Sequence, residues 1–185
     1  FVLFGYLAGL TSRIHFMTGI VILPQRQTVL VAKQAAQVDL LSGGRLTLGV
    51  GVGWNDVEYT ALNETFHNRG RRQEEQVAVL RALWTQRLVT FAGKYHTIPD
   101  AGIHPLPVQR PIPIWFGGGS DASLRRMARL GDGWMTNTWD VERLVSELAT
   151  LRGYISQAGR DPAAFGVDYR ISLSRFPRAE WPRLM

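Results

Sequence analysis

Apolar runs alternate along the chain with segments in which apolar residues recur at helical spacing. Residues 13–23, RIHFMTGIVIL, are rich in β-branched and apolar side chains and stop at Pro24, which predicts one buried strand followed by a turn. The next segment predicts a helix that Thr28 could cap and that Gly43 and Gly44 end, because its apolar residues recur at helical spacing: Val31, Ala35, Val38 and Leu41. A strand at 45–50 follows at once.

The same alternation continues to the end of the chain. A helix is expected from about 70 to 86 with Val77, Leu80, Leu83 and Trp84 on one side, and then a hairpin over 89–98 that turns at Ala92-Gly93. The Pro-rich connector 99–113 could hold a short strand near 103–108. The remaining elements expected are a strand at 112–116, a helix capped by Ser120-Asp121, a strand at 132–137, a helix capped by Asp140 with an apolar stripe (Val141, Leu144, Val145, Leu148, Leu151, Ile155), and a strand at 166–173.

Strands that alternate with helices predict a parallel sheet joined by right-handed crossovers. A (β/α)₈ barrel typically needs about 250 residues, and this chain has 185. Periodicity therefore allows either a barrel that lacks its first two strands or an open doubly wound sheet. The first residues, FVLFGYLAGL, lack a starting methionine and a basic leader, and we expect them to be the tail of a buried helix in a fragment of a longer chain.

The composition of the chain argues against several kinds of binding site. There is no cysteine, and the four histidines show no ligand spacing, so a metal site is not expected. The formal net charge of +6 is dispersed apart from the arginines at 69, 71 and 72, and no nucleic-acid recognition motif is present. Polar residues interrupt every apolar run before it reaches the length of a membrane span. We expect a cytoplasmic protein without nucleic-acid or membrane partners. The charge still allows a site for an anionic small molecule.

Two glycine-rich stretches follow predicted strands. Gly51-Val52-Gly53 precedes Trp54, and FGGGSD, residues 116–121, runs directly into a helix. Three glycines and a serine at a helix start offer free N–H groups, which favours phosphate binding at 117–120. Gly51 and Gly53 could instead serve only to form tight turns. Neither stretch has the spacing of a dinucleotide fingerprint or a Walker loop. Arg72, which lies on one helix face with Arg69 and Glu75, could reach a phosphate or belong to a solvated ion-pair ladder.

The run from LPQRQTVLVAKQAAQVDLLSGGRLTLGVGVGW to FHNRGRRQEE, with LRALW and PIPIWFGGGSDASLRRMARLGDGW, resembles the luciferase-like monooxygenase superfamily, and most of all its probable F420-dependent oxidoreductases. The resemblance covers about residues 1–140. It implies a TIM (β/α)₈ barrel of the luciferase-like type, present as one domain over residues 1–185 without its first two strands and incomplete at its C-terminal end. It also implies a deazaflavin, F420, or alternatively FMN, across the C-terminal mouth of the barrel.

The resemblance further assigns cofactor-binding residues. It places Gly51, Val52 and Gly53 beside the ring and its side chain, and Gly117, Gly118, Gly119 and Ser120 at the cofactor phosphate, which Arg72 would also contact. Ile20 and Val21 match a cofactor-binding bulge that often contains a non-proline cis peptide, expected here at Ile20-Val21. Residues that often serve near the reactive ring position would lie on strands before Phe1, so the catalytic residues stay unknown.

The expected activity is hydride transfer between F420 and an unidentified organic substrate, by a protein that forms a homo-oligomer when full length. Monooxygenation becomes possible if FMN is the cofactor, and the fragment alone is expected to be inactive. Two other readings stay open. One is a TIM-barrel enzyme whose glycine turn holds the phosphate of a phosphorylated metabolite, and the other is a cofactor-binding chain without turnover.

Overall fold

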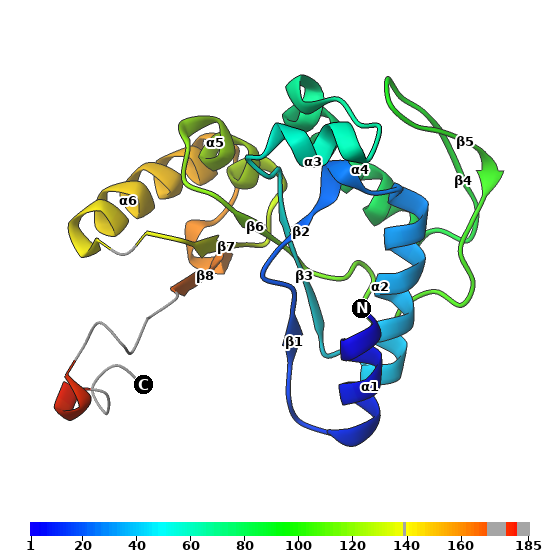
Figure 1. Ribbon diagram of the computed structural model, residues 1–185, viewed down its shortest axis with the longest axis horizontal. Coiled ribbons are helices and arrows are strands. Elements are labelled where there is room, and N and C mark those ends of the chain that lie inside the picture. Colours follow the sequence, from blue (N-terminus) through cyan, green and yellow to red (C-terminus); the bar gives the residue numbers. More distant parts are fainter. Residues whose placement is uncertain (139, 170–176, 181–185) are drawn as a thin grey trace. The chain divides into compact units, whose positions relative to one another are not determined.

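The structure is a computed structural model that describes residues 1–138, 140–169 and 177–180. The chain divides into two compact units, Phe1–Phe116 and Gly117–Met185, which are described separately. Figure 1 shows the elements of both units in chain order. Among the described residues, no helix is both long enough and apolar enough to cross a membrane.

The first unit is built on a parallel sheet whose central strand is β3 (Leu46–Gly51), which is buried along its whole length. β3 pairs with β1 (Phe16–Met17) and β2 (Val21–Ile22) on one side and with β6 on the other. The other elements of this part of the chain are α1 (Val2–Leu10), α2 (Thr28–Ser42), α3 (Asp56–Ala61), α4 (Arg69–Thr85), β4 (Val89–Ala92), β5 (Thr97–Ala101) and β6 (Ile114–Gly117, one residue into the second unit).

The single strand expected over 13–23 is instead two short strands. Between them the Thr18 hydroxyl donates a hydrogen bond to the Gly49 carbonyl (2.8 Å), and the Gly19–Ile20 peptide is cis. This is the expected non-proline cis bond, one bond earlier than Ile20-Val21. The break in the ladder at residues 18–20 explains why a continuous apolar run does not make a continuous strand.

Helices α2 and α4 supply most of the core beside this sheet. Val31, Ala32 and Ala35 of α2 and Leu80 and Trp84 of α4 are almost completely buried, which confirms Trp84 as a core residue. The Trp84 indole N–H also donates to the Ala32 carbonyl (3.0 Å) and so joins the two helices. Gly43 ends α2 in the left-handed conformation (φ +67°), as expected of a helix-ending glycine.

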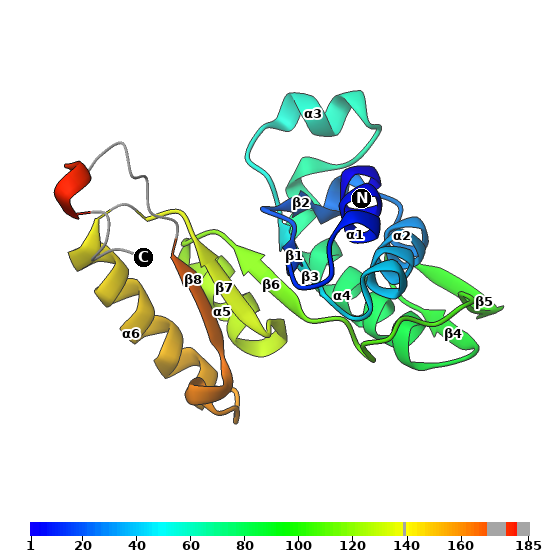
Figure 2. The same ribbon diagram turned by 90° about the horizontal axis from the view of Figure 1, so that it is seen from below.

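Helix α1 exists as expected but is not buried. Ala8 is its buried residue, whereas Val2 is 91% and Tyr6 66% exposed. Both views show α1 beside α2 (Figures 1 and 2). The apolar sequence of α1 therefore predicted its type but not its surroundings.

The hairpin and the Pro-rich connector differ slightly from expectation. β4 and β5 pair antiparallel, and the turn occupies residues 93–96 rather than Ala92-Gly93, with the Gly93 N–H donating to the His96 carbonyl. The connector contains no strand at 103–108, where Pro105 and Pro107 lack the N–H that a ladder requires.

The second unit contains α5 (Asp121–Leu130), β7 (Gly133–Thr136), α6 (Val141–Gln157) and β8 (Gly166–Tyr169). β7 and β8 lie side by side (Figure 2) and are parallel. Their register places Trp134 opposite Val167. Only part of the predicted apolar stripe of α6 is core, because Leu151 and Ile155 are buried while Val141 and Val145 are more than 60% exposed. Residues 170–173 of the expected last strand lie outside the described residues.

Candidate cofactor-binding site

The two glycine-rich stretches begin at neighbouring positions of two paired strands. Val50 of β3 lies opposite Phe116 of β6 in parallel register, and each is followed directly by glycine. The carboxyl ends of parallel strands are where α/β proteins commonly bind ligands. Sequence reasoning placed both stretches at strand ends, and this part of the interpretation is confirmed.

Gly51 and Gly53 make room for two isoleucines of the β1–β2 segment. A Cβ atom at Gly51 would lie 2.6 Å from Ile20 Cδ1, and one at Gly53 (φ +68°) would lie 3.0 Å from Ile22 Cγ2. The absence of side chains at these positions is therefore needed for packing of this segment. A cofactor contact at Ile20, Val21 and residues 51–53 stays a prediction.

The backbone between these glycines is held by a tyrosine of α3, a helix that the sequence reading did not predict. Tyr59 is 1% exposed, and its hydroxyl donates to the Val52 carbonyl at 2.5 Å. Burial raises the pKa of Tyr59 to about 12, so the hydroxyl keeps its proton well above neutral pH. Trp54, in contrast, is 86% exposed.

Arg72 is bound by a carboxylate within its own unit. Its Nη2 donates to Glu64 Oε1 (2.6 Å), and Nη1 pairs with the other carboxylate oxygen. Burial lowers the pKa of Arg72, and its buried Nε has no partner in the described part of the chain. Arg69 stacks on Phe66 instead, so these arginines do not form the ion-pair ladder considered from the sequence. A role for Arg72 at a phosphate stays a prediction.

The predicted phosphate turn, Gly117–Ser120, leads into the N-terminus of α5. Ser120 caps the helix, since its hydroxyl accepts a hydrogen bond from the Ser123 N–H (3.3 Å). Gly118 has φ +105°, a conformation that favours glycine, and its carbonyl accepts the Trp134 indole N–H (2.7 Å). No described residue accepts a hydrogen bond from the Gly118 or Gly119 amide. The turn thus keeps backbone donors available for an anion.

A pocket of about 360 Å³ opens beside this turn within the second unit. Gly118 and Gly119 line it together with residues that follow β7, where the sequence reading proposed no site: Asn137, Thr138, Asp140 and Arg143. Asp140 caps α6 as predicted, and its carboxylate accepts the N–H groups of Glu142 (2.9 Å) and Arg143 (3.2 Å). The pocket therefore offers amide donors and one guanidinium to a small anionic group.

A second carboxylate lies against the turn. Both oxygens of Glu147 are within 3.2 Å of the position that a Gly119 Cβ would occupy, and the side chain is 12% exposed. Thr138 Oγ1 donates to one oxygen (2.7 Å) and Arg143 Nε to the other (2.8 Å). Nothing in the sequence marked Glu147, because it lies in mid-helix, 28 residues after Gly119.

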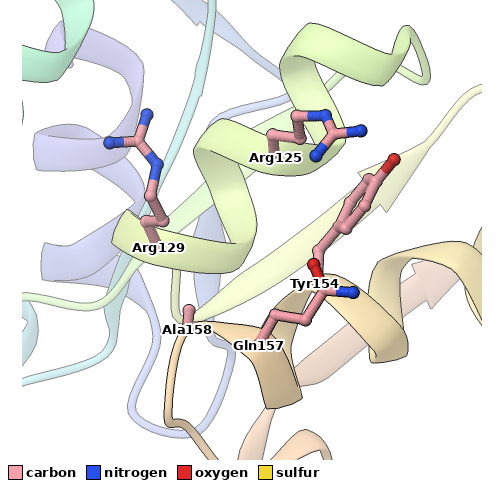
Figure 3. A pocket seen from close by; sticks show the side chains of 5 residues that line it. All are labelled: Arg125, Arg129, Tyr154, Gln157 and Ala158. Atoms are coloured by element: carbon pink, nitrogen blue, oxygen red, sulfur yellow. The ribbon is translucent and has the colours of Figure 1, made fainter.

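Asp121, the first residue of α5, does not cap its helix as expected. Its carboxylate accepts hydrogen bonds from the Tyr154 hydroxyl (2.5 Å) and from Arg125 Nε (2.9 Å), and these two bonds lower the pKa of Asp121. Figure 3 shows Arg125 and Tyr154 at the neighbouring pocket of about 260 Å³ between α5 and α6, which Arg129, Gln157 and Ala158 also line. Asp121 thus has cationic and hydroxyl partners of its own.

A hydrogen-bonded chain of side chains lies elsewhere in the first unit. His96 Nδ1 lies 2.8 Å from Glu75 Oε1, and Thr28 Oγ1 lies 2.7 Å from His96 Nε2. Gln76 Nε2 donates to Thr28 Oγ1 (3.0 Å), and Thr28 is 4% exposed. These hydrogen bonds join α2, α4 and the hairpin. The described residues contain no cluster of three or more histidines and carboxylates suited to a metal ion.

The luciferase-like monooxygenase family matches residues 1–179. An uncharacterised protein of Mycobacterium tuberculosis is 38% identical over 160 residues, which are 86% of this chain and 55% of that protein. The FMNH2-dependent dimethylsulfone monooxygenase of Pseudomonas putida is 36% identical over 134 residues, 70% of this chain and 37% of that enzyme.

The fold is also found in solved structures. The coenzyme F420-dependent tetrahydromethanopterin reductase of Methanopyrus kandleri superposes with a TM-score of 0.81 at 20% identity, over 91% of this chain and 52% of that chain. This protein therefore belongs to the luciferase-like monooxygenase family, a class of flavin- or deazaflavin-dependent oxidoreductases and monooxygenases with a TIM-barrel fold. The chain spans about half the length of the first relatives it matches, and its parallel strands and helices form part of such a barrel.

Proposed function

We propose that the chain is part of an F420-dependent oxidoreductase that transfers a hydride between the deazaflavin and a small organic substrate. Membership of the family supports a flavin-type cofactor. The observation that carries the proposal is the Gly117–Ser120 turn, where the Gly118 and Gly119 amides, which have no acceptor among the described residues, meet a pocket at the start of a helix. We assign this turn to the cofactor phosphate.

The donors at the turn fit an anionic group. The Gly118 and Gly119 amides and the Arg143 guanidinium would bind phosphate oxygens, and glycine at 118 allows the positive φ of +105° that the turn has there. Ile20, Val21 and residues 51–53 would border the ring, with Tyr59 fixing the Val52 carbonyl. When bound, F420 would supply two-electron hydride chemistry, and the protein residues would bind and orient it.

An FMN-dependent monooxygenase is the second candidate, and the Pseudomonas putida relative favours it, because the name of that enzyme specifies FMNH2. The difference matters for the reaction, since a reduced flavin can activate oxygen whereas a deazaflavin is expected to transfer hydride only. We also propose that the full-length protein forms a homo-oligomer and is cytoplasmic. The proposed substrate is a small organic molecule whose identity stays open.

Parallel titration of the purified chain with F420 and FMN, followed by absorbance and cofactor fluorescence, tests the proposal. We expect saturable binding, tighter for F420. Tighter binding of FMN would support the monooxygenase instead. If neither binds while a phosphorylated metabolite does, the glycine turn serves a substrate phosphate. If a cofactor binds and the complete protein shows no turnover with any reductant, the chain is a cofactor-binding protein without activity.

A further inference from the structure

The carboxylate of Glu147 is fixed against the phosphate turn rather than free to swing away. Thr138 and Arg143 each bond one of its oxygens, and 88% of the side-chain surface is covered, since it is 12% exposed. The carboxylate lies directly beside Gly119, because a Cβ atom there would be within 3.2 Å of both of its oxygens. A ligand phosphate on the Gly119 amide would therefore lie close to this negative charge.

The charges around the pocket limit what it can hold. Asp140 and Glu147 bring two carboxylates, whereas the pocket-lining residues include one guanidinium, that of Arg143, already shared with Glu147. Part of the Asp140 charge is offset by the α6 amides that it caps. The turn can still bind an anion through amides, but each additional negative charge on that anion meets a pocket in which two carboxylates stand against one guanidinium.

Resting on the proposed function, we infer that Glu147 is a specificity-determining residue that makes the turn prefer a phosphodiester to a phosphomonoester. A phosphodiester, as in the side chain of F420, carries one negative charge on its phosphate. A phosphomonoester, as in FMN, carries about 1.5 to 2 negative charges at pH 7. Glu147 repels the second charge and leaves the amide contacts to the first intact.

The test uses two ligands that differ in this charge and in one methyl group, FMN and its phosphate methyl ester. Affinities are measured at pH 8 by quenching of flavin fluorescence, first for the parent chain and then for Glu147→Gln, which keeps the shape and an oxygen acceptor for Thr138. We expect the parent to bind the ester on the order of tenfold more tightly than FMN. In Glu147→Gln we expect this ratio to fall towards one, chiefly because FMN binds more tightly.

Asp168→Asn is the matched control, because it removes one negative charge from the exposed part of β8 and should leave the ratio unchanged. Equal affinities of the parent for the two ligands, or a preference for FMN, would overturn the inference without any variant and leave the proposed cofactor binding intact. An unchanged ratio in folded Glu147→Gln would also overturn it. Failure of the parent to bind F420, FMN and the ester would overturn the proposed function itself, and the inference with it.

Discussion

Ile20 Cδ1 lies 2.6 Å from the point where a Gly51 side chain would begin. Real side chains do not approach so closely, so Ile20 can keep its place only because residue 51 is glycine. The glycine that ends β3 therefore serves the packing of the preceding bulge. A contact with a cofactor would be an additional role at the same place.

Gly51→Ala should destabilise the protein by about 1–3 kcal/mol, because the new methyl group overpacks against Ile20. Ile20→Val removes Cδ1, so the loss caused by Gly51→Ala should be smaller in that background. Urea unfolding of the four proteins of this double-mutant cycle measures the coupling. Gly9→Ala in α1, where a Cβ would meet nothing within 4 Å, should not destabilise the protein, which shows that the cost at Gly51 comes from crowding. Equal costs in both backgrounds would contradict the contact.

Tyr59→Phe should lower the free energy of unfolding by about 1 kcal/mol at pH 7, because the Val52 carbonyl loses its donor. The raised pKa, about 12 against an ordinary 10, means that this contribution is complete below pH 10 and is lost as the pH rises towards 12. Absorbance at the tyrosinate band should show one late-titrating tyrosine fewer in the variant than in the parent, while Tyr154, whose pKa the hydrogen bond to Asp121 raises, titrates alike in both. A full tyrosinate signal by pH 11 in folded parent protein would contradict the buried hydrogen bond.

Glu75→Gln should destabilise the attachment of the hairpin to α4, because Glu75 accepts the Lys94 and Tyr95 amides and His96 Nδ1. Burial raises the pKa of Glu75, but these bonds outweigh burial and lower it below the ordinary 4.5. The ionised carboxylate therefore stabilises the fold above about pH 4.5, and its contribution is lost as the pH falls through the lower folded value.

Thermal melts of parent and Glu75→Gln check this between pH 7 and pH 3. The gap in melting temperature should be widest near neutral pH and should narrow at acid pH. Asp168→Asn, on the exposed part of β8, should melt like the parent at neutral pH. A gap that widens as the pH falls would reverse the predicted sign.

The sequence predicted most elements because local signals agree with tertiary structure. Asp140 caps α6, Gly43 ends α2, and Trp84 is buried at the helical spacing that suggested it. The strand over 13–23 was wrong because hydrophobicity does not report where hydrogen-bonded pairing breaks, here at residues 18–20. Exposure of α1 was missed for a related reason, since an apolar sequence does not say which neighbour covers it.

The candidate site was predictable only where its signal is local. Glycines followed by a capping serine mark the phosphate turn within a few residues, and Ser120 caps α5 accordingly. Glu147 reaches Gly119 from a different helix, and Tyr59 reaches Val52 from a helix that was not predicted at all. Such contacts depend on how elements pack, which periodicity does not contain.

Binding of F420 to Gly118→Ala and Gly153→Ala variants tests the central claim most directly. Alanine at 118 meets a left-handed backbone (φ +105°) and Ser123 Oγ at 3.3 Å on the proposed phosphate turn, whereas alanine at 153 of α6 meets open space. With circular dichroism confirming that both variants are folded, fluorescence titration should show F420 binding weakened at least about tenfold by Gly118→Ala and unchanged by Gly153→Ala. Parent affinity in both variants would contradict the assignment of the phosphate to this turn.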